Sequence, residues 1–193
     1  MSSDKTDIRD QIVDAASTLF SKYGFKKATM DEIANTMGKG KSSIYYYFSS
    51  KEEIYEAVIE REAEFLRREV IRTVSQADTP REKLRNYVLV RMKTFSKVSN
   101  FYDAIRTEVV SHLDFIDRIR KKYDREEIRI LQDILEEGIR DNSFRKLELE
   151  LTATAIVTAL KGLEIPLFWN KRGKTGDNPM EPFLDVLFHG IVQ

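Results

Sequence analysis

Residues 38–54 (GKGKSSIYYYFSSKEEI) contain two patterns that could each bind phosphate. Residues 40–42 (GKS) have the composition that ends a nucleotide-binding P-loop. That motif also needs a glycine five residues before its last glycine, where the backbone curls around a phosphate, and this position is occupied by Asn35. The loop must also follow a buried strand, whereas residues 28–37 have the pattern of a capped amphipathic helix. The first pattern therefore does not indicate a nucleotide site.

The second pattern has the spacing of a helix-turn-helix, in which two short helices pack at a steep angle. Ala34 is small where the two helix backbones must approach each other, and Gly38, four residues later, tolerates the positive φ of the turn. Ile44, six residues after that glycine, places an apolar side chain on the inner side of the second helix. Because these three constraints hold together, we predict a helix-turn-helix whose second helix lies near residues 41–47.

Helix start signals divide the rest of the chain. Thr29 and Ser50 each stand three residues before a glutamate, which is the spacing of a capping box, and Thr79 and Asn178 are each followed by a proline. No segment shows the sustained period-two alternation of a strand. We therefore predict an all-α protein of about nine helices, near residues 7–23, 30–37, 41–47, 51–74, 81–97, 101–112, 115–140, 147–172 and 179–192.

Composition narrows the possible functions. Of the 193 residues 41% are hydrophobic, and 32 Lys and Arg balance 32 Asp and Glu, so the net charge indicates no particular partner. The absence of cysteine excludes disulfides, thiolate metal sites and cysteine nucleophiles. With two histidines and no catalytic constellation, we predict no enzyme, no catalytic residue, no metal site and no cofactor. The chain has no apolar leader and no apolar run near the ~20 residues of a membrane span, so we expect a cytoplasmic protein.

From residue 28 to residue 58 (ATMDEIANTMGKGKSSIYYYFSSKEEIYEAV) the chain resembles the DNA-binding domain of the TetR family of transcriptional regulators. The family pattern is lysine, two small residues, an aliphatic residue, tyrosine, any residue, tyrosine or histidine, phenylalanine, and a lysine three residues later. Here residues 41–48 (KSSIYYYF) and Lys51 match it, whereas Gly40 replaces the serine that often caps this helix. The resemblance implies a helix-turn-helix DNA-binding domain at residues 1–52 and a larger helical ligand-binding and dimerisation domain at residues 53–193.

The second helix of the helix-turn-helix would enter the major groove of DNA. A lysine can donate to guanine, a tyrosine can contact a thymine methyl group or a phosphate, and free N–H groups at helix starts favour phosphates. From residue 22 to residue 51 there are six lysines and two acids, and six minus two gives a local charge of +4. The candidate DNA-binding residues are Thr29, Lys39, Gly40, Lys41, Ser42, Ser43, Tyr45, Tyr46, Tyr47 and Lys51.

The last two helices are the candidates for a dimer interface. Residues 151–169 are apolar on more than one face, and such a helix must be covered on both sides. The candidate interface residues are Ile156, Leu160, Leu163, Leu184, Leu187 and Phe188. A monomeric core made of the same helices is the alternative. Pro166 lies inside the apolar stretch and either kinks the helix or ends it.

The resemblance further implies a homodimer on a palindromic double-stranded DNA operator, and a pocket for an inducer in the C-terminal domain. The candidate pocket residues are Phe95, Phe101, Tyr102, Phe115, Tyr123, Glu164, Phe168 and Trp169, although each aromatic side chain also fits an ordinary core. We therefore expect a repressor that is released by a small apolar or amphipathic ligand. The alternative is a TetR-like protein that acts mainly through a protein partner, with DNA binding lost or secondary.

Overall fold

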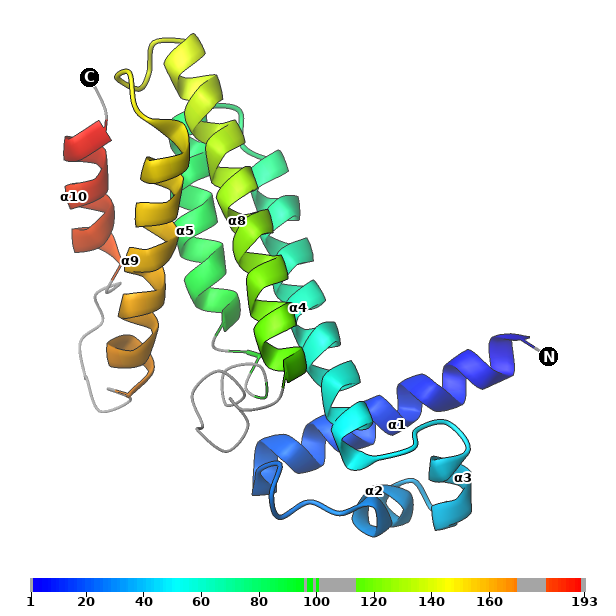
Figure 1. Cartoon of the computed structure of the whole chain (residues 1–193). Coiled ribbons are helices and arrows are strands. Elements are labelled where there is room, and N and C mark those ends of the chain that lie inside the picture. Colours follow the sequence, from blue (N-terminus) through cyan, green and yellow to red (C-terminus); the bar gives the residue numbers. More distant parts are fainter. Residues whose placement is uncertain (1, 96, 99, 101–113, 170–179, 192–193) are drawn as a thin grey trace. The chain divides into compact units, whose positions relative to one another are not determined.

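The computed structural model describes residues 2–95, 97–98, 100, 114–169 and 180–191, and its regular structure there is helical (Figure 1). The helices are α1 (Ser2–Tyr23), α2 (Met30–Thr36), α3 (Lys41–Tyr45), α4 (Lys51–Ser75), α5 (Pro80–Phe95), α8 (Asp114–Arg140), α9 (Leu149–Trp169) and α10 (Glu181–Ile191). The predicted all-α fold with an N-terminal helix-turn-helix is therefore confirmed. The helix predicted near residues 101–112 lies outside the described residues.

The chain divides into two compact units. The first comprises Met1–Phe65 and Val98–Ile119, and the second comprises Leu66–Lys97 and Arg120–Gln193. Helices α4 and α8 each contribute residues to both units, and the domain boundary after residue 52 stays a prediction. Among the described helices, none could span a lipid bilayer, given its length and its polar side chains.

Side-chain caps start two helices of the first unit. At α2, Thr29 Oγ1 accepts a hydrogen bond from the backbone N–H of Glu32 (3.2 Å), and the Glu32 carboxylate accepts one from the Thr29 N–H (2.8 Å). At α4, Ser50 Oγ accepts from the Glu53 N–H (3.2 Å), but the Glu53 carboxylate accepts from the N–H and hydroxyl of Ser49 (2.7 Å each). These hydrogen bonds from Ser49 lower the pKa of Glu53. In this second capping box, the glutamate carboxylate therefore binds Ser49, the residue before the predicted cap Ser50.

One face of each helix builds the core of the first unit. Helix α1 buries residues at helical spacing, and the segment between α1 and α2 adds an aromatic ring. The rings of Phe20, Phe25 and Tyr55 pack together with centroid separations of 5.8, 5.1 and 4.6 Å. Aromatic contacts of this kind add to the free energy gained from apolar burial. The core residues from α1 and α4 are Ile12, Val13, Ala16, Phe20, Ile54, Tyr55, Val58 and Ile59.

Lys51, the first residue of α4, is tied to the segment between α1 and α2. Its ammonium donates hydrogen bonds to the backbone carbonyls of Phe25 (2.8 Å) and Ala28 (3.0 Å) and lies 4.4 Å from the centre of the Phe25 ring. A third carbonyl, that of Lys26, is 3.5 Å away. This segment is not helical, so its carbonyls need donors from elsewhere. Lys51 therefore stabilises the folded unit, in addition to any contact with a ligand.

Asn100 is a buried polar residue that joins three parts of the first unit. Its side-chain amide lies 2.7 Å from Glu62 Oε1, 2.9 Å from Ser21 Oγ, and 3.1 Å from both the hydroxyl and the carbonyl of Ser17. Its backbone carbonyl accepts a hydrogen bond from the Tyr55 hydroxyl (3.3 Å). A buried amide without hydrogen-bond partners would lower the stability of the fold. These hydrogen bonds satisfy the amide and connect residue 100 to both α1 and α4.

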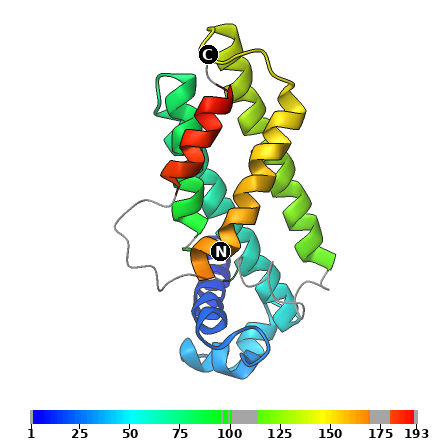
Figure 2. The ribbon, with the colours of Figure 1, turned by 90° about the vertical axis from the view of Figure 1, so that its left-hand side faces the viewer.

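Ion pairs join α8 to its neighbours within the second unit, where Figures 1 and 2 show it running beside α5 and α9. The pairs are Arg67 of α4 with Glu126 (3.0 Å), Lys83 of α5 with Glu137 (2.7 Å) and Lys161 of α9 with Asp124. Each pair is partly exposed, so each contributes modestly to stability. Together they fix the positions of α5 and α9 along α8.

A further ion pair between α5 and α8 is almost fully buried. Arg91, which is 3% exposed, donates from Nε to Glu127 Oε1 (2.6 Å) and from Nη2 to Oε2 (3.2 Å). The Tyr87 hydroxyl donates to the same carboxylate (3.3 Å). Burial and the nearby Glu127 charge raise the pKa of Tyr87 well above its usual range. A paired geometry of this kind offsets the cost of removing the charges from water.

Helix α8 ends in a turn that returns to the helix. Asn142 has a φ of 63°, and the Phe144 N–H donates to the Gly138 carbonyl (2.8 Å). The Phe144 ring, which is 1% exposed, covers Gly138, and a β-carbon at that position would overlap the ring. Gly138 is therefore required by the close approach of an aromatic ring.

We expect Gly138→Ala to lower the free energy of unfolding by about 1–3 kcal/mol, because the ring or the helix must shift to admit a methyl group. Denaturant unfolding followed by circular dichroism measures the change. Glu136→Ala, on the exposed side of the same helix, should stay within about 0.5 kcal/mol of wild type. Equal stability of the two variants would show that the ring moves aside freely.

We expect Lys51→Ala to lower the free energy of unfolding by about 1.5–3 kcal/mol, the range for hydrogen bonds to charged groups. The carbonyls of the segment between α1 and α2 lose their donor in this variant. The control is Lys39→Ala, which removes the same charge from an exposed position in the turn. If both variants unfold at the same denaturant concentration, Lys51 has no such internal role.

Candidate nucleic-acid interface

The turn between α2 and α3 is built from backbone hydrogen bonds. The Met37 N–H donates to the Ala34 carbonyl (3.1 Å), and the Lys39 N–H donates to the same carbonyl (3.0 Å). Gly38 between them has a φ of 63°, a backbone conformation that residues with a side chain rarely adopt. Ala34 and Ile44 are both buried, at 2% and 0% exposure. The predicted small residue, turn glycine and inner apolar residue therefore have the roles that their spacing indicated.

Helix α3 is anchored from one side and exposed on the other. Its buried side chains are Ile44 and, just beyond its end, Phe48. It is shorter than predicted, because the Tyr47 N–H bonds to the Ile44 carbonyl (3.0 Å), three residues back, and the helical pattern ends. The exposed residues are Lys41, Ser42, Tyr45 and Tyr46, whereas Ser43 and Tyr47 are half-buried.

The exposed face of α3 combines an ammonium, a hydroxyl and two phenol rings. Tyr46 is 65% exposed, and its ring lies edge-on to Tyr47 with centroids 5.0 Å apart. Donors and flat apolar groups of this kind match the acceptors and methyl groups on base edges in the major groove. Gly40, which caps α3 without a side chain, leaves the first N–H groups of the helix open. The contacts of these residues with DNA stay a prediction.

Lys41 has a partner that the sequence did not reveal. Its ammonium lies 2.9 Å from Asp31 Oδ2 in the first turn of α2, and the two side chains are 52% and 58% exposed. The hydrogen bond and charge of Asp31 raise the pKa of Lys41. Because the two residues are ten positions apart and belong to different helices, no local pattern could indicate the pair.

The other candidate DNA-binding residues have different surroundings. Lys39 and Gly40 are exposed in the turn. The Thr29 hydroxyl is used by the cap of α2, where it also donates to Glu32 Oε2 (2.9 Å). The Lys51 ammonium faces the carbonyls between α1 and α2, so a phosphate could meet it only beside or instead of those carbonyls. For Lys51 the phosphate contact stays a prediction, and the internal role is an addition.

The predicted ligand pocket is only partly within the described residues. Phe101 and Tyr102 lie outside them, and so do the side chains of Phe95, Glu164, Phe168 and Trp169. Phe115 is buried in the first unit, edge-on to Tyr55 with centroids 6.3 Å apart. Tyr123 is half-buried and belongs to the second unit. Helix α9 continues through Pro166 to Trp169.

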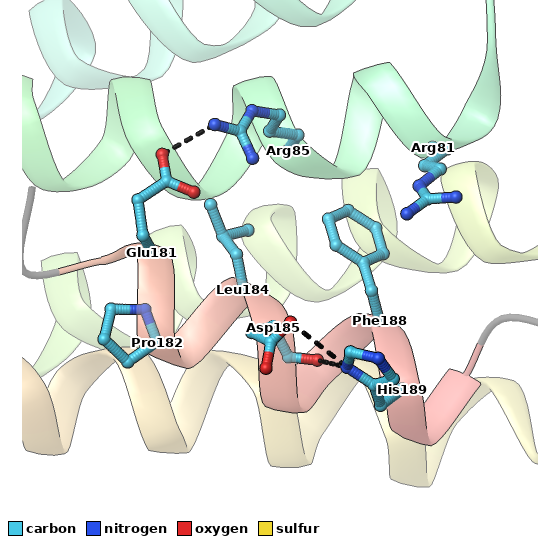
Figure 3. Close-up of a pocket in the computed structure, with 8 residues that line it drawn as sticks. All are labelled: Arg81, Arg85, Glu181, Pro182, Leu184, Asp185, Phe188 and His189. Carbon is cyan, nitrogen blue, oxygen red and sulfur yellow. Dashed lines mark hydrogen bonds and ion pairs between the residues drawn. The ribbon is translucent and has the colours of Figure 1, made fainter.

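A hollow of about 820 Å³ lies between α5 and α10 in the second unit (Figure 3). Its charged residues form pairs: Arg85 Nη2 donates to Glu181 Oε1 (2.6 Å), and His189 Nδ1 lies 3.2 Å from Asp185 Oδ1. The Arg81 guanidinium lies 5.0 Å from the centre of the Phe188 ring. Two arginines balance two acids here, so the hollow offers little net charge to an ion. The Arg85–Glu181 pair and the contact of Arg81 with Phe188 instead hold α10 against α5, whereas the contact of His189 with Asp185 lies within α10.

The predicted dimer residues are mostly buried within one chain. Ile156, Leu160, Leu184 and Phe188 are buried, and Leu163 and Leu187 are half-buried. The same two helices have a second face that is exposed, and on α9 this face carries no charge, whereas on α10 it includes Glu181 and Asp185. On α9 it consists of Leu151, Thr154, Ala155, Thr158, Ala159 and Gly162, and on α10 its most exposed apolar residue is Val186. The contact of these residues with a second copy stays a prediction.

Known proteins resemble this chain both in the helix-turn-helix and over its full length. The family model "Bacterial regulatory proteins, tetR family" matches residues 12–58. The HTH-type transcriptional repressor KstR2 of Mycolicibacterium smegmatis is 27% identical over 96% of this chain and 91% of its own. IcaR of Staphylococcus aureus, a negative transcriptional regulator of a biofilm operon, is 47% identical over 49 residues, which are 25% of this chain and 26% of that protein.

A solved structure extends the likeness to the whole fold. The crystal structure of a transcriptional regulator from Cytophaga hutchinsonii has a TM-score of 0.76 and 26% identity, covering 95% of this chain and 98% of that one. The proteins named here are transcriptional regulators and not enzymes. The matched segment contains α2, the turn at Gly38 and α3. Residues 12–58 therefore form a DNA-binding domain of the TetR family, and over its full length the chain is similar to transcriptional regulators.

Proposed function

We propose that the protein is a homodimeric transcriptional repressor that binds a palindromic operator and is released by a small apolar or amphipathic ligand. The observation that carries the proposal is the exposed face of α3, held outward by the buried Ile44 and Phe48. A helix positioned in this way can place its first residues in the major groove. The full-length likeness to a protein named as a repressor supports repression over activation. A cytoplasmic location is proposed as well, because it is consistent with a DNA-binding role.

Some residues of the helix-turn-helix are proposed to contact base edges, and others to contact phosphates. Lys41 and Tyr45 are four residues apart and share the exposed side of α3, so they are proposed to contact base edges. Tyr46 and Tyr47 are proposed to contact the backbone or thymine methyl groups. The N–H groups that the side-chain caps leave unused at the starts of α2 and α4, and those at the start of α3, would position the phosphates.

A dimer is proposed because one helix-turn-helix contacts few base pairs. The exposed face of α9 is suited to contact a second copy, because its residues between Leu151 and Gly162 are small or apolar and carry no charge. The Thr158 hydroxyl donates to the Thr154 carbonyl (2.8 Å), so it does not need an acceptor from a second copy. The buried residues on the opposite face, such as Ile156 and Leu160, would support this interface from beneath.

Release by a ligand would act through a helix shared by both units. Helix α4 is a single helix of 25 residues, with its first part in the helix-turn-helix unit and its last part in the second unit. A ligand that changes the packing of the second unit could therefore move a rigid element of the first. Its differential affinity for the two arrangements would set the size of the effect.

The function is tested by selecting binding sites from random duplex DNA with the purified protein. We expect a palindrome with half-sites about one helical turn, ~34 Å, apart. Lys41→Ala and Tyr45→Ala should each weaken binding to the selected site by about tenfold, within the ~1–3 kcal/mol of a specific contact. Lys121→Ala, an exposed position on α8, should keep the wild-type Kd.

Two outcomes would contradict the proposal in different ways. Unchanged affinity in both α3 variants would reject the assigned roles while leaving DNA binding intact. No enriched sequence from the folded protein would reject operator binding and favour action through a protein partner.

The dimer is tested by a charge on the exposed face of α9. We expect Ala159→Arg to convert the protein to a monomer in sedimentation velocity, because an arginine pair at a two-fold interface is repelled and poorly hydrated. Gln76→Arg adds the same charge at an exposed position after α4 and should leave the dimer intact. A dimeric Ala159→Arg variant with wild-type affinity would place the interface elsewhere.

A further inference from the structure

The ion pair between Lys41 and Asp31 lies on the surface that is proposed to face DNA. The Lys41 ammonium is 2.9 Å from Asp31 Oδ2, and about half of each side chain is exposed. Lys41 is the first residue of α3, and Asp31 lies in the first turn of α2. A carboxylate beside a surface that binds a polyanion weakens binding, because it repels phosphates. Its presence at this position therefore calls for an explanation.

The carboxylate changes what Lys41 can bind. A lysine ammonium has three N–H donors, and Asp31 uses one of them. Two donors remain, but the pair has no net charge. A phosphate that approached this ammonium would also approach the Asp31 carboxylate and be repelled by it. The O6 and N7 atoms of guanine are neutral acceptors, so they can take the remaining donors without that repulsion.

We propose that Asp31 is a specificity-determining residue that directs Lys41 away from phosphates and toward a neutral base-edge acceptor of guanine. The inference rests on the proposed function, since it concerns how the same surface recognises DNA. Asp31 acts through Lys41 and is a positioning residue. It also holds the flexible lysine stem near one conformation before DNA arrives, which reduces the entropy lost on binding.

An ordinary surface ion pair is the competing explanation. Exposed pairs contribute little to stability, and many have no function. The two explanations differ in what happens on removing the charge of Asp31. A purely structural pair leaves DNA sequence preference unchanged, whereas the proposed pair does not.

The decisive variant is Asp31→Asn, which keeps an oxygen acceptor and the side-chain shape while removing the charge. We expect its affinity for non-specific duplex DNA to rise about three- to tenfold, roughly what one charge pair at contact distance is worth in water. The slope of log K against log salt should steepen by about 0.9, since Lys41 would neutralise one more phosphate. The preference for guanine at one position of each half-site should fall at least about fivefold.

Three further variants isolate the cause. Asp31→Glu keeps the charge and should keep the wild-type guanine preference and salt slope. Glu60→Gln removes one exposed carboxylate from α4 in the same unit and controls for the change in net charge. In a Lys41→Ala background, Asp31→Asn should no longer alter the sequence preference, because the residue through which it acts is gone. Thermal unfolding of each variant confirms that the fold is kept.

The same selection separates the two levels of the proposal. If the wild-type protein enriches no sequence, operator binding fails, and the role of Asp31 fails with it. If the wild type enriches a palindrome and Asp31→Asn enriches the same palindrome with the same salt slope, only the role of Asp31 is overturned. An equal effect of Asp31→Asn with and without Lys41 would also overturn it, by showing general repulsion of DNA.

Discussion

An isolated helix of five residues is not stable in water, because the free energy of nucleating a helix is unfavourable and one turn of hydrogen bonds does not offset it. The surface of α3 therefore depends on the side chains that fasten it from within. Ile44 and Phe48 are fully buried, and the Arg9 guanidinium of α1 lies 4.7 Å from the centre of the Phe48 ring. Gly38 brings α3 back onto α2 through a φ that only glycine adopts easily. The exposed tyrosines can thus be large and numerous, because they do not have to stabilise the helix that carries them.

The sequence predicted those features that are local, and missed those that join distant positions. The turn glycine, the inner apolar residue and the caps at Thr29 and Ser50 all lie within a few residues of each other, so spacing alone indicates them. Asp31 with Lys41 and Asn100 with Glu62 connect residues from different elements. Their partners are ordinary polar residues, and only the folded chain shows that they meet. Helix α3 also ended early because its last turn tightened, which no residue type required.

In the second unit, the apolar pattern of α9 was predicted correctly, but the sequence did not indicate which of its faces is buried. The region of α9 was predicted to be apolar on more than one side, and it is. Ile156 and Leu160 are buried against the same chain, whereas Leu151, Ala155 and Ala159 are exposed. Sequence periodicity shows that a helix has two apolar sides but does not say which side its own chain covers. The buried Arg91 and Glu127 were missed for the same reason as Asp31.

The exposed face of α9, which is proposed as the dimer interface, would have a consequence for a cell that makes several related regulators. Interfaces discriminate between partners by their own contacts and by penalties against wrong partners, which are steric clashes, unpaired charges or desolvated polar groups. From Leu151 to Gly162 this face offers no charge, so a mismatched subunit would meet no electrostatic barrier there. Fidelity of assembly would then depend on the fit of small side chains such as Ala155 and Ala159. A single added methyl group on this face could decide which subunits are able to mix.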